Sequence, residues 1–423
     1  MPTVIQKPRG TKDLYGVDLK RTQELCSIIR DMFISYGYSE IRTPIFEFME
    51  VFEYNDEALL AANKEFFQIK SRDSDGEVAE DRAGFVLRPE NTASVARALI
   101  ENKIMNKQVD YELRYFYEGP YFRYERPQNG RQRQFTQMGI EKINAHSIHD
   151  DLENIVIVHA IQERLGIQLC LKINYLGNEK TKKIWNNALQ EYFEEYRDQL
   201  TPISQKRINE NPMRILDDKV DCQKNFVKNA PKIETFLTKE EMRNMEKIKE
   251  LISTLKIHSI HDPCLVRGID YYTGLIYEWI DEKTGLTIIA GGRYDHLFER
   301  FGEQKTPALG LAIGIERLKA LLEREDYQWQ NDQSYYLYLY PQEELTPEYY
   351  KWVYEWRKLI SQQSYKVYCI ASYEILSPEK HQKIAKKQSQ NGKVYMIEGN
   401  GYNYTNADIE AQFKKFIEYM KDN

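Results

Sequence analysis

Side chains that could bind a charged, planar ligand gather in the stretch YFRYERPQNGRQRQFTQMGIEKI, residues 121–143. Alternating segments flank a polar loop at Gly130, which predicts an antiparallel hairpin with a long tip. Arg123 and Glu125 share one face of its first strand. One face of its second strand carries Arg133, Phe135, Gln137, Gly139 and Glu141. This surface suits a ligand-binding floor, and a solvated hairpin with surface ion pairs is the alternative that these residues leave open.

Arginines also stand at the ends of other expected strands or at glycine turns. With the hairpin they make a set of four, Arg123, Arg267, Arg293 and Arg317. A guanidinium stays charged and can bind two oxygens at once, which favours phosphate recognition. The chain has no GxxxxGK[ST] loop, no GxGxxG opening a helix, and no HIGH or KMSKS sequence. A nucleotide site is therefore expected on an antiparallel sheet.

Composition limits the remaining classes of function. The net charge of -6 gives no overall attraction to nucleic acid, although four arginines cluster between residues 122 and 134. Five scattered cysteines without a CxxC pair predict reduced thiols in a cytosol and no cysteine zinc site. The histidines show no ligand spacing, and His146 and His149 are expected at the surface. Neither a secretory signal nor a membrane span is expected, because no long apolar run occurs.

The elements that must position these residues follow from periodicity. Residues 19–36 predict an amphipathic helix, and residues 38–44 predict a short strand. Residues 85–100 predict a strand that leads into a helix, with Asn91 or Thr92 as the helix cap. In 264–280, polar residues between two glycines are expected ahead of an apolar strand. A strand ending in a glycine turn is expected in 288–295, and a strand followed by a helix in 309–322.

The length of 423 residues predicts about three domains. Long charged runs in residues 166–256 predict a helical insertion. The insertion divides a discontinuous domain made of residues 1–165 and 257–325. Alternating strands and helices in residues 332–423 predict a small α/β domain. The fold class expected for the whole chain is α+β.

Several segments resemble the motifs of the class II aminoacyl-tRNA synthetases. YGYSEIRTP is similar to motif 1, FRYERP through RQFTQMGIE to motif 2 with its loop, and ALGLAIGIERL to motif 3. The segment LVRGIDYYTGLIYE with AGGRYD is similar to the histidine-binding signature of the histidyl-tRNA synthetase family, and LRPENTA and NPMRILDDK also match. The resemblance covers residues 5–322 and implies an antiparallel sheet flanked by helices.

The family resemblance implies a reaction and a set of partners. The implied enzyme activates histidine with ATP to histidyl-adenylate and transfers it to the 3′ end of histidine tRNA. Mg²⁺ bridging the phosphates is implied, without identified protein ligands. A cytoplasmic homodimer is also implied, and residues 332–423 would bind the anticodon.

Residue roles follow from the same resemblance. For ATP, Arg123 would hold the α-phosphate, Glu125 the adenine edge and Arg131 the terminal phosphates, while Phe135 and Arg317 would cover the two faces of the base. For histidine, the residues implied are Glu90, Thr92 and Gln137 at the ammonium group, Glu141 and Tyr272 at the imidazole, and Arg267 between the carboxylate and the α-phosphate, with Tyr271 also in the histidine site. Gln128 and Arg131 at the hairpin tip would contact the tRNA acceptor end.

Some positions depart from the family pattern, namely Asn91, Gln132, Thr136 and His296. The C-terminal segment matches only faintly, through HQKIAKKQSQNGKVYMI, so its reading of an anticodon is left open. Two alternatives remain at this point. One is a synthetase-like regulatory subunit of histidine biosynthesis, and the other is an adenylating paralogue that does not use tRNA.

Overall fold

A computed structural model describes residues 5–52, 66–69, 84–105, 111–127, 130–267, 271–330, 335–362, 367–389, 392–399 and 405–422. The chain divides into two compact units, one of residues 1–14 and 25–327 and one of residues 15–24 and 328–423. Each unit contains its own sheet. None of the described helices combines the length and apolar character needed to cross a membrane.

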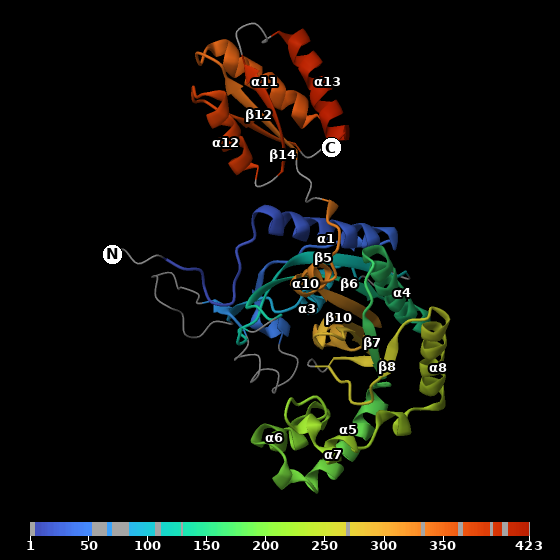
Figure 1. Ribbon diagram of the computed structural model, residues 1–423. Helices are drawn as coiled ribbons and strands as arrows, with labels where there is room; N and C mark the ends of the chain where they lie inside the picture. Colours follow the sequence, from blue (N-terminus) through green and yellow to red (C-terminus); the bar gives the residue numbers. More distant parts are fainter. Residues whose placement is uncertain are drawn as a thin grey trace, which may run out of the picture. The chain divides into compact units, whose positions relative to one another are not determined.

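The first unit is built on an eight-stranded sheet (Figure 1). Its middle strands pair antiparallel, whereas the edge pairs β1–β5 and β7–β8 are parallel. The order across the sheet is β1 (Ser39–Glu40), β5 (Leu113–Phe122), β6 (Gln134–Ile143), β11 (Ala308–Gly314), β10 (Leu286–Arg293), β9 (Thr273–Asp281), β7 (Cys170–Tyr175) and β8 (Ser259–His261). The predicted α+β class with a largely antiparallel sheet is confirmed.

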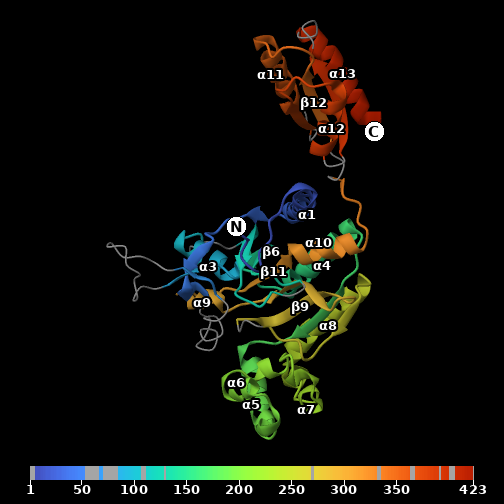
Figure 2. The ribbon, with the colours of Figure 1, turned by 60° about the vertical axis from the view of Figure 1, so that its left-hand side comes forward.

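Helices cover one face of this sheet, and Figure 2 shows them along it. Residues 25–35 of α1 (Gly16–Ser35) place the Phe33 ring 5.9 Å from that of Phe116 on β5. Lys142 of β6 binds Asp150 in α4 (Ile148–Leu165). A third helix, α10 (Ile315–Arg324), lies beside the other end of β6.

The opposite face packs against α3 (Thr92–Glu101) and the short helix α9 (Leu297–Arg300). Tyr117 and Tyr121 of β5 are buried in this layer. A small sheet formed by β2 (Phe46–Phe48), β4 (Phe85–Leu87) and β3 (Gln68–Ile69) leads into α3. Since the odd-numbered residues of β6 point to this face, the polar residues predicted for a ligand floor lie here.

A helical region with its own apolar core follows β7. Trp185, Leu189 and Phe193 are fully buried in it. Its helices are α5 (Glu179–Glu194), α6 (Pro202–Glu210) and α7 (Asn225–Lys228), with short 3₁₀ turns between them, whereas α8 (Lys239–Thr254) lies beside α4 (Figure 1). The strand β7 lies within the segment 166–256 that the sequence assigned to the insertion, yet it pairs with β9 in the central sheet.

The second unit contains a parallel three-stranded sheet in the order β13-β12-β14. Trp352 and Trp356 are buried in its core. The alternation of strands and helices matches the order expected from the sequence. Its elements are β12 (Tyr335–Pro341), α11 (Pro347–Ser361), β13 (Val367–Ala371), α12 (Pro378–Gln388), β14 (Lys393–Gly399) and α13 (Asn406–Asp422).

Arg293 has a structural place rather than the phosphate-binding one that its position after a strand suggested. Its Nε donates to both oxygens of Asp151, at 3.2 and 3.1 Å, and its Nη2 donates to the carbonyl of Ser147 at 3.1 Å. Burial raises the pKa of Asp151 to about 6 against the opposing charge of Arg293. The pair fixes the start of α4 to the end of β10, which leaves this guanidinium committed.

Candidate active site

The β5–β6 hairpin pairs continuously from Leu113 with Ile143 to Phe122 with Gln134. The first strand therefore ends before Arg123 and Glu125, so these two residues follow the strand and do not share a strand face, contrary to the prediction. The reason is local, because the Glu125 amide donates to the Arg123 carbonyl at 2.8 Å and closes a tight turn. The predicted hairpin itself is confirmed.

Three arginines and one ring lie at the loop end of the hairpin. The Arg123 guanidinium carbon is 5.2 Å from the Phe135 ring centroid, and its Nε donates to the Pro89 carbonyl at 3.1 Å. Arg131 pairs with Glu125 at 2.8 Å. Arg317 donates to the Gly130 carbonyl at 2.7 Å and also to a carbonyl of β10. The structure thus brings together the residues that the sequence assigned to ATP.

The electrostatics of this cluster favour an anion. Burial lowers the pKa of the Arg317 guanidinium, and the positive charges of Arg131 and Arg123 lower it further. Within the described part of the chain, Arg123 and Arg317 have no carboxylate partner. A polyphosphate would supply the missing negative charge and accept hydrogen bonds from the guanidinium groups.

The other end of the hairpin face carries a buried carboxylate. Glu141 is 1% exposed and accepts a hydrogen bond from the Thr92 hydroxyl at 2.7 Å and another from the Tyr294 hydroxyl. Burial raises the pKa of the Glu141 carboxyl to about 8, and these hydrogen bonds oppose the shift. A carboxyl poised in this way can accept a hydrogen bond from a ligand or share a proton with it.

Glycines keep the floor beside Glu141 open. Gly310 of β11 lies opposite Glu141, and a Cβ added there would collide with the Glu141 carboxylate and crowd the carbonyl of Ile140. A Cβ at Gly139 would collide with the Tyr117 hydroxyl and the backbone of β11. Only hydrogen fits at these two positions, because the neighbouring polar groups occupy the space above the sheet.

Asn91 stands at the N-cap position of α3, as predicted, but its side chain makes no capping hydrogen bond, and the Glu90 carboxylate takes that role. This carboxylate accepts from the backbone amides of Thr92 at 2.5 Å and Ala93 at 3.1 Å. The Asn91 side chain is instead buried, and its Oδ1 accepts from Thr43 at 2.7 Å and from Arg88 at 3.3 Å. Asn91 thus departs from the family pattern without exposing a new group in the site.

Arg267 and Tyr272 form a third part of the site, next to the helical region. The Arg267 guanidinium carbon is 5.7 Å from the Tyr272 ring centroid and pairs with Glu278 on β9. The Arg267 Nε is buried and has no hydrogen-bond partner among the described residues. Its N–H is therefore available to a ligand oxygen, since a buried donor without a partner is costly.

A small pocket adjoins Arg267 and Tyr272. Asn211, Met213 and Arg214, from the NPMRILDDK segment, line it from the helical region. This places the most distinctive sequence of that region beside the signature residues. The remaining lining residues are Leu176, Lys182 and Val266.

Other predicted residues are placed as follows. Gln137 is half-buried between Gly119 of β5 and Gly314 of β11, on the face of Glu141. Tyr271 is buried with its ring 5.5 Å from that of Tyr294. Gln128, assigned to the tRNA acceptor end, lies outside the described residues.

Two departures from the family pattern engage local partners. His296 pairs with Glu299 in the first turn of α9, and the Thr136 amide donates to Glu316 at 2.8 Å. Neither arrangement removes one of the predicted ligand contacts.

Sequence reasoning missed three residues that complete the site. Tyr294 binds Glu141, Tyr117 lies against the glycine floor, and Glu278 holds Arg267. Tyr294 belongs to the AGGRYD segment, which was a usable signal. Nothing in the local sequence marks Tyr117, because the contact depends on strand register.

Known proteins resemble this chain in sequence and in fold. A family model described as histidyl-tRNA synthetase matches residues 10–318. The histidine–tRNA ligase of Malacoplasma penetrans is 41% identical over 79% of this chain and 78% of its own length, and that of Ureaplasma urealyticum is 42% identical over 81% of each. The apo histidyl-tRNA synthetase of S. aureus superposes with a TM-score of 0.73 at 28% identity, covering 93% of this chain and 92% of its own.

The burial of Glu141 should make the free energy of unfolding depend on pH. In the unfolded chain this carboxyl loses its proton near the ordinary value of 4.5, whereas the folded chain keeps it until about pH 8. Folding therefore takes up a proton between these limits. Between about pH 5.5 and 7.5 the free energy of unfolding of the wild type should fall, relative to Glu141→Gln, by about 1.4 kcal/mol per pH unit. Urea titrations of both proteins measure the slope.

The exposed Glu343 supplies the matched control. Glu343→Gln should run parallel to the wild type over the same pH range. Parallel profiles for wild type and Glu141→Gln would show that Glu141 is not a buried, proton-retaining group.

Proposed function

This chain belongs to the histidyl-tRNA synthetase family and is an ATP-dependent histidine–tRNA ligase, and we propose that histidine meets ATP on the polar face of the β5–β6 hairpin. The observation that carries this location is the difference between the two ends of one face, with guanidinium groups at one end and a buried carboxyl at the other. Arg123 and Arg317, without carboxylate partners in the described chain, lie at one end, and the buried Glu141 lies at the other.

Histidine would bind at the Glu141 end. Glu141 accepts a hydrogen bond from the proton-bearing nitrogen of the imidazole. Tyr272 orients the ring, and Tyr271 packs behind it. Glu90, Thr92 and Gln137 receive the α-ammonium group. An apolar amino acid would leave Glu141 buried and without a ligand partner, which costs binding free energy and gives the site its specificity.

ATP would bind at the arginine end. Phe135 stacks on the adenine, Arg317 covers the other face, and Glu125 accepts from the exocyclic amine. Arg123 holds the α-phosphate and Arg131 the terminal phosphates. The Arg123 guanidinium lies near the Phe135 ring, which supports this assignment. One ATP molecule could therefore contact Arg123 with its α-phosphate and Phe135 with its base.

The first step would be attack of the histidine carboxylate on the α-phosphorus. A new phosphorus–oxygen bond forms, the bond to the β-phosphate bridge breaks, and pyrophosphate leaves with the electron pair. The carboxylate is already ionised at neutral pH, so no general base is needed. Arg267 and Arg123 stabilise the negative charge on the phosphoryl oxygens and hold the two reactants in line.

Mg²⁺ is expected to arrive with the nucleotide. Both oxygens of Glu278, a carboxylate beside Arg267, have protein partners, since one binds Arg267 and the other accepts from Thr287 at 2.9 Å. Glu125 is likewise paired with Arg131. These carboxylates do not form a preassembled oxygen cage, so phosphate oxygens and water would supply most ligands of the ion.

The second step would transfer the histidyl group to the terminal ribose of histidine tRNA. The ribose hydroxyl oxygen attacks the carbonyl carbon of the adenylate, and AMP leaves. Arg131 and Gln128, at the hairpin tip, would contact the acceptor end through its phosphates. The regulatory and tRNA-independent alternatives are disfavoured because curated relatives at about 40% identity are histidine–tRNA ligases.

The α/β unit of residues 332–423 would bind the anticodon part of the tRNA. It lies beyond residues 10–318, which the family model matches. Exposed lysines lie along α12, among them Lys380, Lys383, Lys386 and Lys387. A helix carrying several exposed positive charges can neutralise phosphates, which dominate the affinity of proteins for nucleic acids.

A homodimer in the cytoplasm is the proposed working state. Ile34, Phe46 and Phe48 are 54%, 54% and 49% exposed, and they lie near the end of α1 and in β2, around the segment that resembles motif 1. A second copy would bury these side chains by a two-fold contact. The five free cysteines suit a reducing compartment where tRNA charging takes place.

Removing Arg123 tests the ATP site. Arg123→Ala should lower histidine-dependent ATP–pyrophosphate exchange by about two to three orders of magnitude, equivalent to roughly 3–4 kcal/mol of lost transition-state stabilisation. Arg267→Ala should have an effect of the same order. Arg42, 80% exposed, gives the control Arg42→Ala, which should exchange at the wild-type rate. Near-normal exchange by Arg123→Ala in a folded protein would remove the assignment.

Charge reversal on α12 tests the role of the second unit. Lys383→Glu/Lys387→Glu should lower kcat/KM for histidine tRNA by about tenfold or more, because two phosphate attractions become repulsions, and should leave pyrophosphate exchange unchanged. The control Lys414→Glu/Lys415→Glu changes two exposed lysines of α13. Wild-type charging by both double variants would argue against tRNA binding by this unit.

Sedimentation equilibrium tests the homodimer. A dimer should have a mass of about 100 kDa, twice the 50.3 kDa of the chain. Ile34→Glu should shift the protein toward monomer because it buries a charge in the proposed contact. Ile203, 62% exposed on α6, supplies the control Ile203→Glu, which should remain dimeric. A wild-type mass near that of one chain at micromolar concentration would contradict the proposal.

A further inference from the structure

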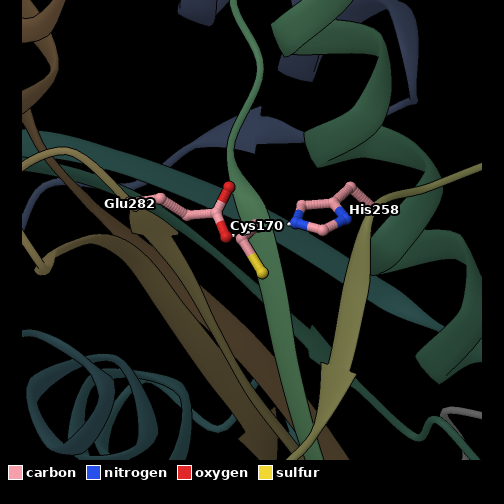
Figure 3. A group of neighbouring side chains, drawn as sticks. All are labelled: Cys170, His258 and Glu282. Atoms are coloured by element: carbon pink, nitrogen blue, oxygen red, sulfur yellow. Dashed lines mark hydrogen bonds and ion pairs between the residues drawn. The ribbon is translucent and has the colours of Figure 1, made fainter.

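Three side chains with metal-binding atoms lie together away from the active site. They are the thiol of Cys170, the imidazole of His258 and the carboxylate of Glu282, and Figure 3 shows Cys170 between the other two. One ligand atom from each lies within 4.8 Å of the other two. Within the described residues this is the single group of its kind.

Strand register explains why they meet. β7 and β8 are parallel and pair Leu171 with Ser259, so Cys170 and His258 stand side by side at the preceding position. β9 pairs Ile280 with Cys170, and Glu282 follows two residues later, on the same side of the chain as Ile280. The three groups therefore come from three neighbouring strands and project from one face of the sheet edge.

The set of donors matches the preference of zinc. Zn²⁺ takes sulfur, imidazole nitrogen and carboxylate oxygen in a tetrahedron, with bonds of about 2.0 to 2.3 Å, so its ligand atoms are separated by about 3.5 Å. His258 Nε2 and Glu282 Oε1 are already 3.2 Å apart. The exposed side chains of His258 and Glu282 can close the remaining distance to Cys170 by rotation, since Cys170 is held in the sheet and they are not.

We propose that Cys170, His258 and Glu282 bind one zinc-class divalent ion, with water in the fourth position. The ion would fasten the edge strand β8 and the end of β9 to the start of β7. Because β7 leads into the helical region and β8 follows it, the ion would clamp the two connections of that region to the sheet. Its role is structural, and it is separate from histidine activation.

The positive charge nearest Cys170 on its own strand is partly balanced. Lys172, two residues along β7, is the nearest positive charge to Cys170 from its own strand, and its Nζ lies 3.6 Å from the Asp262 carboxylate. Its charge is thus partly balanced locally. The simpler arrangement is a His258–Glu282 ion pair whose glutamate also interacts with the Cys170 thiol, and an exposed ion pair of this kind is worth little stability.

Cobalt substitution on the untagged full-length chain, without histidine or ATP, tests the site. The metal-free protein should bind one Co²⁺ per chain with a near-ultraviolet thiolate-to-cobalt band and intense visible bands of a tetrahedral ion, and Zn²⁺ should displace it. Cys170→Ser should abolish the thiolate band. His258→Ala and Glu282→Gln should weaken binding by roughly 10- to 100-fold or more, since even indirect supports of metal ligands have effects of that size.

Thermal unfolding gives a second readout. Zn²⁺ should raise the unfolding midpoint of the wild type and not that of Cys170→Ser. Cys222→Ser and His146→Ala, which change a cysteine and a histidine elsewhere in the same unit, should behave as wild type in both measurements. A thiolate band that survives Cys170→Ser, or binding that His258→Ala leaves unchanged, would overturn the site.

Discussion

The burial of one carboxylate, that of Glu141, is the constraint on which the active face depends. A group 1% exposed and held between strands must have its oxygens satisfied, and Thr92 and Tyr294 supply hydroxyl donors from two different elements. The neighbouring strand can approach only because Gly310 has no Cβ. The position of α3, the AGGRYD turn and the central strand are therefore coupled through a single side chain.

The two ends of the hairpin face carry different groups, which suits a ligand with different ends. At the loop end, burial lowers the pKa of Arg317, and the positive charges of Arg131 and Arg123 lower it further. At the other end, burial raises the pKa of Glu141. A ligand that is anionic at one end and bears a proton-donating ring at the other satisfies both. In the proposed arrangement the histidine carboxylate is directed at the α-phosphate of ATP, and the arginines would stabilise the negative charge that develops there.

An arginine bonded to other groups of the protein differs in role from one that has no carboxylate partner. Like Arg123 and Arg317, Arg293 stands near the end of a strand in the sequence. Its guanidinium, however, is bonded to Asp151 and to two backbone carbonyls just before α4. The Glu90 carboxylate accepts from two amides at the start of α3, which fixes the helix end that presents Thr92, and it is also proposed to receive the α-ammonium group of histidine. A residue's partners therefore say more about its role than its type does.

The sequence by itself determined the α+β class, the β5–β6 hairpin and the strands and helices of the C-terminal unit, because periodicity and turn chemistry are local. The residues proposed to bind ATP came from the resemblance of the motifs. The sequence also supplied Glu141, whose face follows from alternation along one strand. Only the tertiary structure decided which arginines remain available, that Tyr117 and Tyr294 complete the site, and that β7 belongs to the sheet. It alone placed Cys170, His258 and Glu282 together. The physical reason is that each of these contacts joins residues far apart in the chain, through strand register and burial that no local pattern encodes.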